Sequence, residues 1–174
     1  MTAAPAFDFH CHSLCSDGAL SPQALIELAA ERGLQQLAIT DHDTAAAYTP
    51  QLSDQATDAQ ITLVSGCELS CLWQRRSIHV VGLNIDLAHP VFVQAMGEQA
   101  QARDRRAEKI TAVLQRMGFS LELAHIQRIA GDGVVGRPHF AEYLVRTNQM
   151  PSMAAAFKRA LGAGKPGDIK AEWP

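Results

Sequence analysis

The sequence has no apolar run long enough to cross a membrane, which takes roughly 20 consecutive residues. Its first five residues, Met-Thr-Ala-Ala-Pro, do not combine a charged segment with the apolar stretch of a secretory signal. We therefore expect neither a membrane span nor export, and we predict a cytoplasmic protein.

An excess of basic charge is also missing. Lys and Arg number 15 against 18 Asp and Glu, which gives a formal net charge of −3. Such a chain has no global field that attracts nucleic acid, so we expect no DNA-binding module, although a local basic patch is compatible with these numbers. Apolar residues make up 47% of the chain, enough to bury a core and to exclude intrinsic disorder.

Cysteine is scarce and clustered. The four cysteines form two C-x3-C pairs, Cys11 with Cys15 and Cys67 with Cys71. Such pairs are compatible with disulfides, zinc ligands or plain thiols. Because no export signal precedes them, we favour reduced thiols.

Short apolar runs alternate with helical patterns over the first half of the chain. We predict strands at 7–13, 37–40, 61–64 with a continuation to Glu68, and 78–85. One helix is expected to begin at Ser21-Pro22, a typical cap followed by proline, and to end at Gly33. A second covers part of 45–59, where we expect Pro50 to break it. This alternation favours a parallel α/β architecture, which places chemistry at the carboxyl edge of the strands.

After about Pro90 the pattern is helical, and no strand is evident. We predict helices at 91–117, 121–130, 138–147 and 152–161, with a glycine-rich turn at 131–136. The expected organisation is an α/β part at 1–90, an all-helical subdomain at 91–161, and a polar tail at 162–174.

His10 and His12 form an H-x-H pair on the first predicted strand. Side chains two residues apart on a strand point to the same face, so both imidazoles can reach one ion. Cys11 between them points to the opposite face and is a poor ligand for that ion. Asp17 follows in a loop, where an aspartate on its own is more often a turn former.

Three further polar residues accompany the later strands. His42 follows strand 37–40 between two aspartates. The alternative interpretation of this segment is a helix cap by Asp43 or Thr44, which is compatible with a ligand role for His42. Glu68 ends a buried-type strand, and a carboxylate there must be paired, hydrated or metal-bound. His79 lies within an apolar run, where a lone histidine is more often a hydrogen-bonded core residue.

Taken together, four successive strands each bring an imidazole or a carboxylate near one edge. Mixed nitrogen and oxygen ligands suit zinc, manganese or iron. A cluster of this kind would be costly to bury without a cation. We therefore predict a divalent metal site.

The ordered pattern resembles the PHP (polymerase and histidinol phosphatase) family of metal-dependent phosphoesterases. The matching stretches are Phe7-Asp8-Phe9-His10-Cys11-His12-Ser13, Ser16-Asp17-Gly18, Ile39-Thr40-Asp41-His42-Asp43, Gly66-Cys67-Glu68 and His79-Val80-Val81-Gly82. The helical half resembles an insertion in one branch of that family. Members of this branch hydrolyse phosphate from nucleoside 3′,5′-bisphosphates and trim RNA 5′ ends.

The resemblance implies a distorted (β/α)7 barrel, incomplete here, with an all-helical insertion. It also implies two or three divalent ions, Mn2+, Fe2+ or Zn2+. By this resemblance His10 and His12 would ligate one ion, and Glu68 would bridge it to a second ion held by His79.

Asp17 and His42 would bind a third ion, and Asp41 would orient an imidazole. Water bridging the metals would become a hydroxide and attack phosphorus in line. The implied substrate is a small phosphorylated nucleotide or an RNA 5′ end.

Part of the family pattern is missing. A whole PHP enzyme has further strands that carry another histidine and a late Asp-x-His pair, but no histidine follows His139. We therefore expect the chain to be truncated at its C-terminal side. The alternative is a PHP remnant that binds metal without catalysis.

The run Gly131-x-Gly133-x-x-Gly136 matches a dinucleotide-binding pattern by letter, but a helical pattern precedes it where a strand is required. We therefore exclude that site. Arg137 and His139 follow at a helix start, where free N–H groups and an arginine suit a phosphate. An ordinary cap with a surface arginine is also compatible. The resemblance favours substrate binding, because this branch carries Arg-Pro-His here, and His139 is then also a possible metal ligand.

A basic stretch, Arg103, Arg105, Arg106 and Lys109, is interrupted by acidic residues and predicts a solvated helix face, with RNA contact as the alternative. Besides the PHP remnant, three rival functions stay open. An amidohydrolase-like enzyme acting on a non-phosphorylated substrate predicts no role for Arg137. A PHP hydrolase of another phosphorylated metabolite is the second. A binding module stapled by zinc at the C-x3-C pairs is the third.

Overall fold

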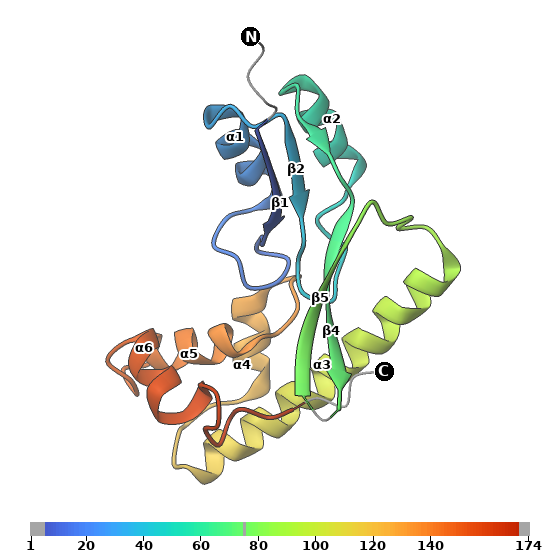
Figure 1. Cartoon of the computed structure of the whole chain (residues 1–174). Coiled ribbons are helices and arrows are strands. Elements are labelled where there is room, and N and C mark those ends of the chain that lie inside the picture. Colours follow the sequence, from blue (N-terminus) through green and yellow to red (C-terminus); the bar gives the residue numbers. More distant parts are fainter. Residues whose placement is uncertain (1–5, 75, 171–174) are drawn as a thin grey trace.

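The computed structural model describes residues 6–74 and 76–170 (Figure 1). The first half contains β1 (Phe7–Cys11), α1 (Pro22–Glu31), β2 (Gln36–Ile39), α2 (Pro50–Asp58), β3 (Thr62–Leu63), β4 (Gly66–Trp73) and β5 (Arg76–Leu83). The second half contains α3 (Pro90–Arg116), α4 (Leu123–Ala130), α5 (Arg137–Arg146) and α6 (Met153–Ala156), which continues as a π-helical turn at Phe157–Leu161. The expectation about the first five residues, and the tail from 171 to 174, lie outside the described residues. No described helix combines the length and apolarity that a bilayer span requires.

The strands form two sheets. The predicted parallel arrangement is confirmed for the first sheet and wrong for the second. β1, β2 and β3 pair in parallel, in that order. β4 and β5 form an antiparallel hairpin, with Trp73 opposite Arg76 at its tip. The reason is the length of the connection, because a parallel crossover needs a dozen or more residues and a hairpin needs only a few.

The two sheets meet at one point, a parallel bridge between His42 and Glu68. The Glu68 N–H donates to the Asp41 carbonyl at 3.1 Å, and the Asp43 N–H donates to the Glu68 carbonyl at 3.0 Å. The segment that follows β2 is thereby held against the start of β4.

Proline begins the helices of the first half. Ser21 Oγ accepts the Ala24 N–H before Pro22 at the start of α1, and Thr49 Oγ1 accepts the Leu52 N–H before Pro50 at the start of α2. The prediction that Pro50 breaks a helix is therefore wrong. A proline in the first turn lacks only an N–H that would have no helical partner there.

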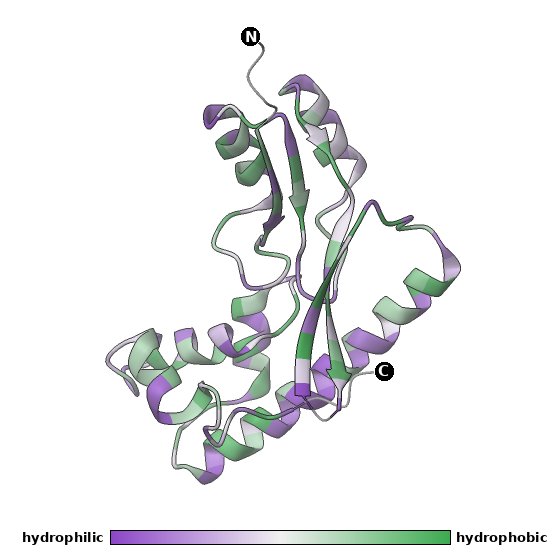
Figure 2. Cartoon of the chain, viewed as in Figure 1, coloured by the Kyte–Doolittle hydropathy of each residue, from purple (hydrophilic) through white to green (hydrophobic). Residues whose placement is uncertain are grey.

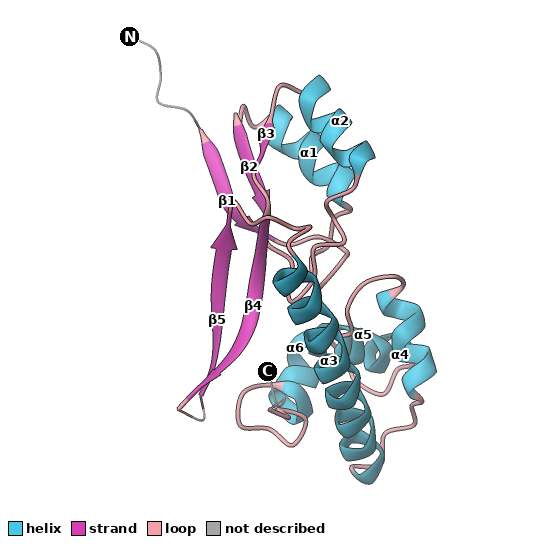
Figure 3. Cartoon of the chain, turned by 90° about the vertical axis from the view of Figure 1, so that its right-hand side faces the viewer, coloured by secondary structure: helices cyan, strands magenta, loops and turns pink. Residues whose placement is uncertain are grey.

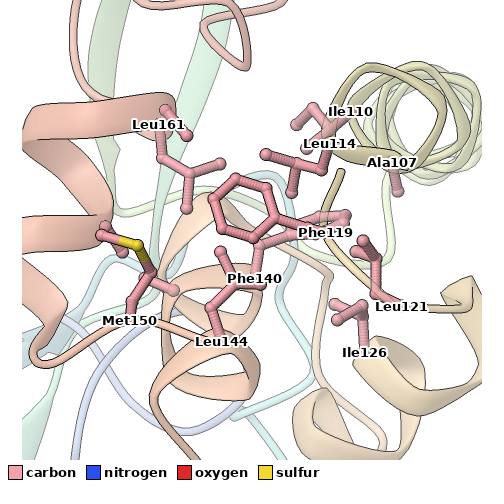
Figure 4. Close-up of a cluster of buried hydrophobic side chains, with 13 residues drawn as sticks. Ala107, Ile110, Leu114, Phe119, Leu121, Ile126, Phe140, Leu144, Met150 and Leu161 are labelled. Carbon is pink, nitrogen blue, oxygen red and sulfur yellow. The ribbon is translucent and has the colours of Figure 1, made fainter. Parts of the chain in front are cut away.

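Two hydrophobic clusters form the core. One lies between α1, α2 and the parallel sheet, around Ile26, Ile39 and Leu52. The other joins α3 to α4, α5, α6 and the π-helical turn, and Figure 4 shows Phe140 at its centre beside Leu114 and Leu144. Each half of the described chain thus has apolar packing of its own.

Polar contacts tie α3 to the hairpin. Figure 2 shows that α3 is largely hydrophilic where it passes β4 and β5. Gln99 donates to the Ser70 carbonyl at 2.8 Å, and Arg103 donates to Asp43 from Nε at 2.7 Å and from Nη2 at 2.5 Å. The view of Figure 3 separates α3 from the strands and shows the helix running beside them.

The predicted solvated face of α3 is wrong for two of its four basic residues. Arg103 is buried and Arg106 is half-buried, whereas Arg105 and Lys109 are exposed. A carboxylate partner 60 residues away, Asp43, is what makes burial of Arg103 tolerable.

We expect Arg103→Ala to lower the free energy of unfolding by about 3–5 kcal/mol, because it leaves Asp43 charged and buried without its cation. Arg105→Ala, an exposed position on the same helix, is the matched control and should change stability by less than about 0.5 kcal/mol. Urea denaturation of both variants measures the difference. Equal midpoints would show that the buried pair contributes nothing to folding.

Candidate metal centre and adjoining cavity

Glu68 lies at the centre of a group of four histidines. Its Oε2 atom is 2.8 Å from His12 Nε2, 3.0 Å from His10 Nε2 and 3.7 Å from His42 Nδ1. Its Oε1 atom is 3.1 Å from His79 Nδ1. One carboxylate therefore faces all four predicted imidazoles.

Backbone geometry explains this convergence. His10 and His12 share one face of β1, because side chains two apart on a strand point the same way. On the hairpin His79 pairs with Ser70, which places it diagonally across from Glu68 on the same face. The sheet-joining bridge brings His42 to Glu68.

Asp17 brings a second carboxylate to the group. Its Oδ1 atom lies 3.0 Å from His12 Nδ1, and its Oδ2 atom lies 3.8 Å from His42 Nε2. His12 thus stands between two carboxylates, with one ring nitrogen toward Asp17 and the other toward Glu68.

Asp41 holds the loop that carries Asp17. Its carboxylate accepts the Ser13 N–H at 2.7 Å, the Ser13 hydroxyl at 2.5 Å and the Ser16 hydroxyl at 2.5 Å. These three bonds satisfy a side chain that is almost fully buried. Asp41 therefore shapes the site through the loop backbone.

The acid–base state of the group follows from its contacts. The hydrogen bond with Asp17 raises the pKa of His12 above 6.5 and lowers the pKa of Asp17 below 3.8. Burial lowers the pKa of His42 to about 4. Burial would raise the pKa of Glu68, but the His10 hydrogen bond and the charges of the other imidazoles outweigh it and lower that pKa.

These residues fit divalent cations. Three groups each place their ligand atoms within 4.8 Å of one another: His10, His12 and Glu68; His12, Asp17 and His42; His42, Glu68 and His79. The Nδ1 atom of His42 is buried and has no hydrogen-bond partner within the part of the chain that the structure describes. A neutral imidazole nitrogen without a hydrogen bond, in a group of four histidines and two carboxylates, is a donor that zinc, manganese and iron use.

A cavity of about 440 Å³ opens from this cluster toward the helical half. Asp17, His42 and His79 line one part of it. The other lining side chains with a positive charge are Arg103, Arg106, Arg137 and Lys170. One cavity is thus lined both by residues that can bind a metal and by several positively charged side chains.

The positively charged side chains of the cavity differ in their hydrogen-bond and ion-pair partners. Arg137 donates to Asp168 at 2.8 Å and to the Leu161 carbonyl at 3.0 Å, and Lys170 lies 3.1 Å from Asp168. Arg106 donates to the Ile169 carbonyl at 2.9 Å. Burial, with the nearby charges of Arg137 and Arg103, lowers the pKa of Arg106 to about 10.

The two predicted substrate residues are separated. Arg137 lines the cavity, but His139 does not; it lines a neighbouring hollow of about 860 Å³ together with Asp17. His139 Nδ1 accepts the Gly136 N–H at 2.9 Å at the start of α5, and burial lowers its pKa. His139 belongs to none of the three candidate ligand groups.

Sequence reasoning gave Asp43 and Asp168 no role at the site, and it gave Arg103 and Arg106 one only as the RNA-contact alternative to a solvated helix face. Asp43 was visible only as a neighbour of His42, and no local signal connects it with α3. The two arginines lie in a mixed-charge run that is typical of exposed helices, so their burial had no sequence signature. The predicted cysteine behaviour is compatible with the structure: all four are free thiols, and none is in a ligand group.

Comparison with known proteins identifies relatives of this chain. The sequence profile of the PHP domain matches residues 8–157. The chain is 39% identical over 168 residues to the 5′-3′ exoribonuclease Rnm of Escherichia coli, covering 96% of this chain and 57% of the relative. It is 35% identical over 170 residues to the 3′,5′-nucleoside bisphosphate phosphatase of Chromobacterium violaceum, covering 95% and 58%.

Two solved structures have a similar fold. An amidohydrolase from Chromobacterium violaceum, with bound sulfate, superposes with a TM-score of 0.85 at 33% identity, over 97% of this chain and 59% of that one. A candidate metal-dependent phosphoesterase from Bifidobacterium adolescentis gives a TM-score of 0.88 at 26% identity, over 98% and 60%. The chain thus spans less than two thirds of the length of these relatives.

In the metal-free protein we expect His12 and His42 to titrate in well-separated pH ranges. His12 should keep its proton at pH 6.5, because Asp17 raises its pKa, whereas His42 should stay neutral until the pH falls to about 4. The raised pKa of His12 contributes stability that is complete below pH 6.5 and is lost as the pH rises through the folded-state value.

Histidine side-chain NMR across a pH titration measures both groups. Asp17→Asn should move the His12 midpoint down and leave His42 the lower of the two. A His42 midpoint at or above that of His12 would contradict the assigned environments.

Proposed function

The chain belongs to the PHP family, and from this premise we propose that it carries the metal centre and part of the substrate site of a phosphoesterase. The proposed substrate is a nucleoside 3′,5′-bisphosphate or the 5′ end of an RNA. Two relatives with 35–39% identity are named for these two activities. The activity, substrate and partners of the whole protein are part of this proposal, since the chain spans only part of those relatives.

One observation carries the proposal. The cavity beside the candidate metal centre is lined by three arginines and a lysine. Guanidinium groups recognise phosphate oxygens through charge-assisted, often bidentate, hydrogen bonds. The metal-ligand groups suit the reacting phosphorus of a phosphate ester. The guanidinium groups around the same cavity suit its negatively charged oxygens.

Divalent ions at this centre would activate water as the nucleophile and offset the negative charge on the phosphoryl oxygens. His10, His12 and Glu68 form the first proposed set of ligands, and Glu68 is shared with His42 and His79. Asp17 completes the set around His12 and His42. Manganese, iron or zinc suits these nitrogen and oxygen donors, and two or three ions would match the three groups.

The remaining residues bind and orient. We assign Arg137 to a substrate phosphate, together with Arg106. Among the described residues, the Arg106 guanidinium has a backbone carbonyl but no carboxylate as a hydrogen-bond partner. We assign His139 to holding the Gly136 N–H and so the start of α5, which presents Arg137. Asp41 orders the loop of Asp17 through Ser13 and Ser16.

We further propose that the two sheets belong to an incomplete (β/α)7 barrel of the PHP kind. Residues 1–90 would form the barrel part, 91–161 the helical insertion, and 162–174 the start of a return to the barrel. The separate apolar clusters of the two halves support this division.

We expect Glu68→Ala to remove bound metal, because Glu68 belongs to two of the three candidate ligand groups. Elemental analysis of protein from manganese- and iron-supplemented cells should give one or more ions per wild-type chain and fewer in the variant. Glu27→Ala, an exposed glutamate on α1, is the matched control and should retain the wild-type content. A folded wild-type chain without metal would overturn the metal-binding part of the proposal.

We expect Arg137→Ala to lower kcat/KM for phosphate release from a nucleoside 3′,5′-bisphosphate by roughly ten- to a hundredfold, as for loss of a charge-assisted hydrogen bond. Arg116→Ala, exposed at the end of α3, should have no effect. Calorimetry with inorganic phosphate measures binding independently of turnover. Unchanged turnover and unchanged phosphate binding in Arg137→Ala would overturn the assignment of Arg137 to a substrate phosphate. A metal-loaded wild-type protein that releases no phosphate would favour the amidohydrolase-like reading, in which the substrate carries no phosphate.

A further inference from the structure

The glycine-rich connection between α4 and α5, residues 131–136, lies against the loop that carries Asp17. The two segments are distant in sequence and lie side by side at the middle of the molecule (Figure 1). Val134 N–H donates to the Cys15 carbonyl at 3.0 Å. Cys15 is two residues from Asp17, so this bond reaches the metal-ligand loop directly.

Gly133 makes this approach possible. A Cβ atom at Gly133 would lie 2.5 Å from the Leu14 carbonyl oxygen, 3.0 Å from the Ala130 carbonyl oxygen and 3.1 Å from the Cys15 carbonyl carbon. All three neighbours are backbone atoms, which cannot swing away as the end of a side chain can. Any side chain at this position must push the connection away from the loop.

The loop after β1 is thereby held from two sides. On one side Asp41 accepts hydrogen bonds from Ser13 and Ser16. On the other side the connection supplies the Val134 bond and the close contact at Gly133. Between these supports the Ser13 carbonyl accepts the Gly18 N–H at 2.9 Å, which closes the loop around Asp17.

We propose that Gly133 is a positioning residue for the metal ligand Asp17. The helical half places Asp17 beside His12 and His42 by pressing residues 131–136 against Leu14 and Cys15. The same connection leads directly into Arg137 at the start of α5, so it fixes one metal ligand and one cation of the cavity together. This inference rests on the metal-binding part of the proposed function.

Manganese titration followed by the EPR signal of free Mn2+ tests the inference. Gly133→Ala should bind the Asp17-dependent ion about ten- to a hundredfold more weakly, the usual cost of disturbing a residue that supports a ligand. Gly97→Ala is the matched control, because a Cβ there meets nothing within 4 Å. Its isotherm should coincide with that of the wild type.

A double-mutant cycle separates positioning from a general loss of stability. Asp17→Ala should lose the same ion, and Gly133→Ala combined with Asp17→Ala should bind Mn2+ as Asp17→Ala alone does. Losses that multiply in the double variant, or an unchanged isotherm for Gly133→Ala, would overturn the inference. Wild-type protein that binds no Mn2+ would overturn the proposed metal centre as well, so the two failures are distinguishable.

The unmodified protein provides a second test in case Gly133→Ala does not fold. If the connection and Asp17 are coupled, Mn2+ must slow hydrogen exchange in the peptide containing the Val134 amide, since linkage acts in both directions. Asp17→Ala should abolish that protection while its remaining ions still bind. Equal exchange with and without Mn2+ would overturn the coupling.

Discussion

The structure depends on Glu68 more than on any other described residue. Its backbone joins the two sheets, through hydrogen bonds to Asp41 and Asp43 on either side of His42. Its side chain faces the four imidazoles that the strands bring together. The carboxylate is nearly buried, and a buried charge is tolerable only when opposite charges or cations surround it. The backbone of Glu68 thus joins the two sheets, and its buried carboxylate must be neutralised by positive charge at the site.

Residues 41–43 connect Glu68 to the rest of the molecule, because each of their side chains contacts a different segment. Asp41 points to the loop of Asp17, His42 faces the ligand group, and Asp43 binds Arg103 of α3. Asp43 adopts a positive φ of 53°, an uncommon backbone state that its bonds to Ser70 and Arg103 hold in place. Three successive residues therefore connect the parallel sheet, the hairpin and the helical half. A disturbance of α3 should consequently reach the ligand group through Asp43.

Local pattern was enough to predict most elements, because strand periodicity and capping residues act over a few positions. The six candidate ligands came from that pattern together with the resemblance to the PHP family, and their role in metal binding stays a prediction. His10 and His12 needed only the two-residue repeat of a strand. The antiparallel direction of β5 was missed because an apolar run such as 78–85 has the same composition in either direction. Burial of Arg103 was missed because its partner Asp43 is 60 residues away. Sequence position also does not reveal that His139 and Arg137 line different hollows. What failed were the contacts made only by tertiary packing.

The positions of the positively charged side chains indicate that the helical half contributes to the cavity beside the ligand group. Arg103 and Arg106 come from α3 and Arg137 from α5, yet all three line the cavity that the strand histidines open. Like charges held this close repel one another, and Arg106 already has a pKa lowered to about 10 by burial and its neighbours. Asp43 and Asp168 offset part of that charge, at Arg103 and Arg137. The phosphate group of the proposed substrate, entering beside Arg106, would offset the rest.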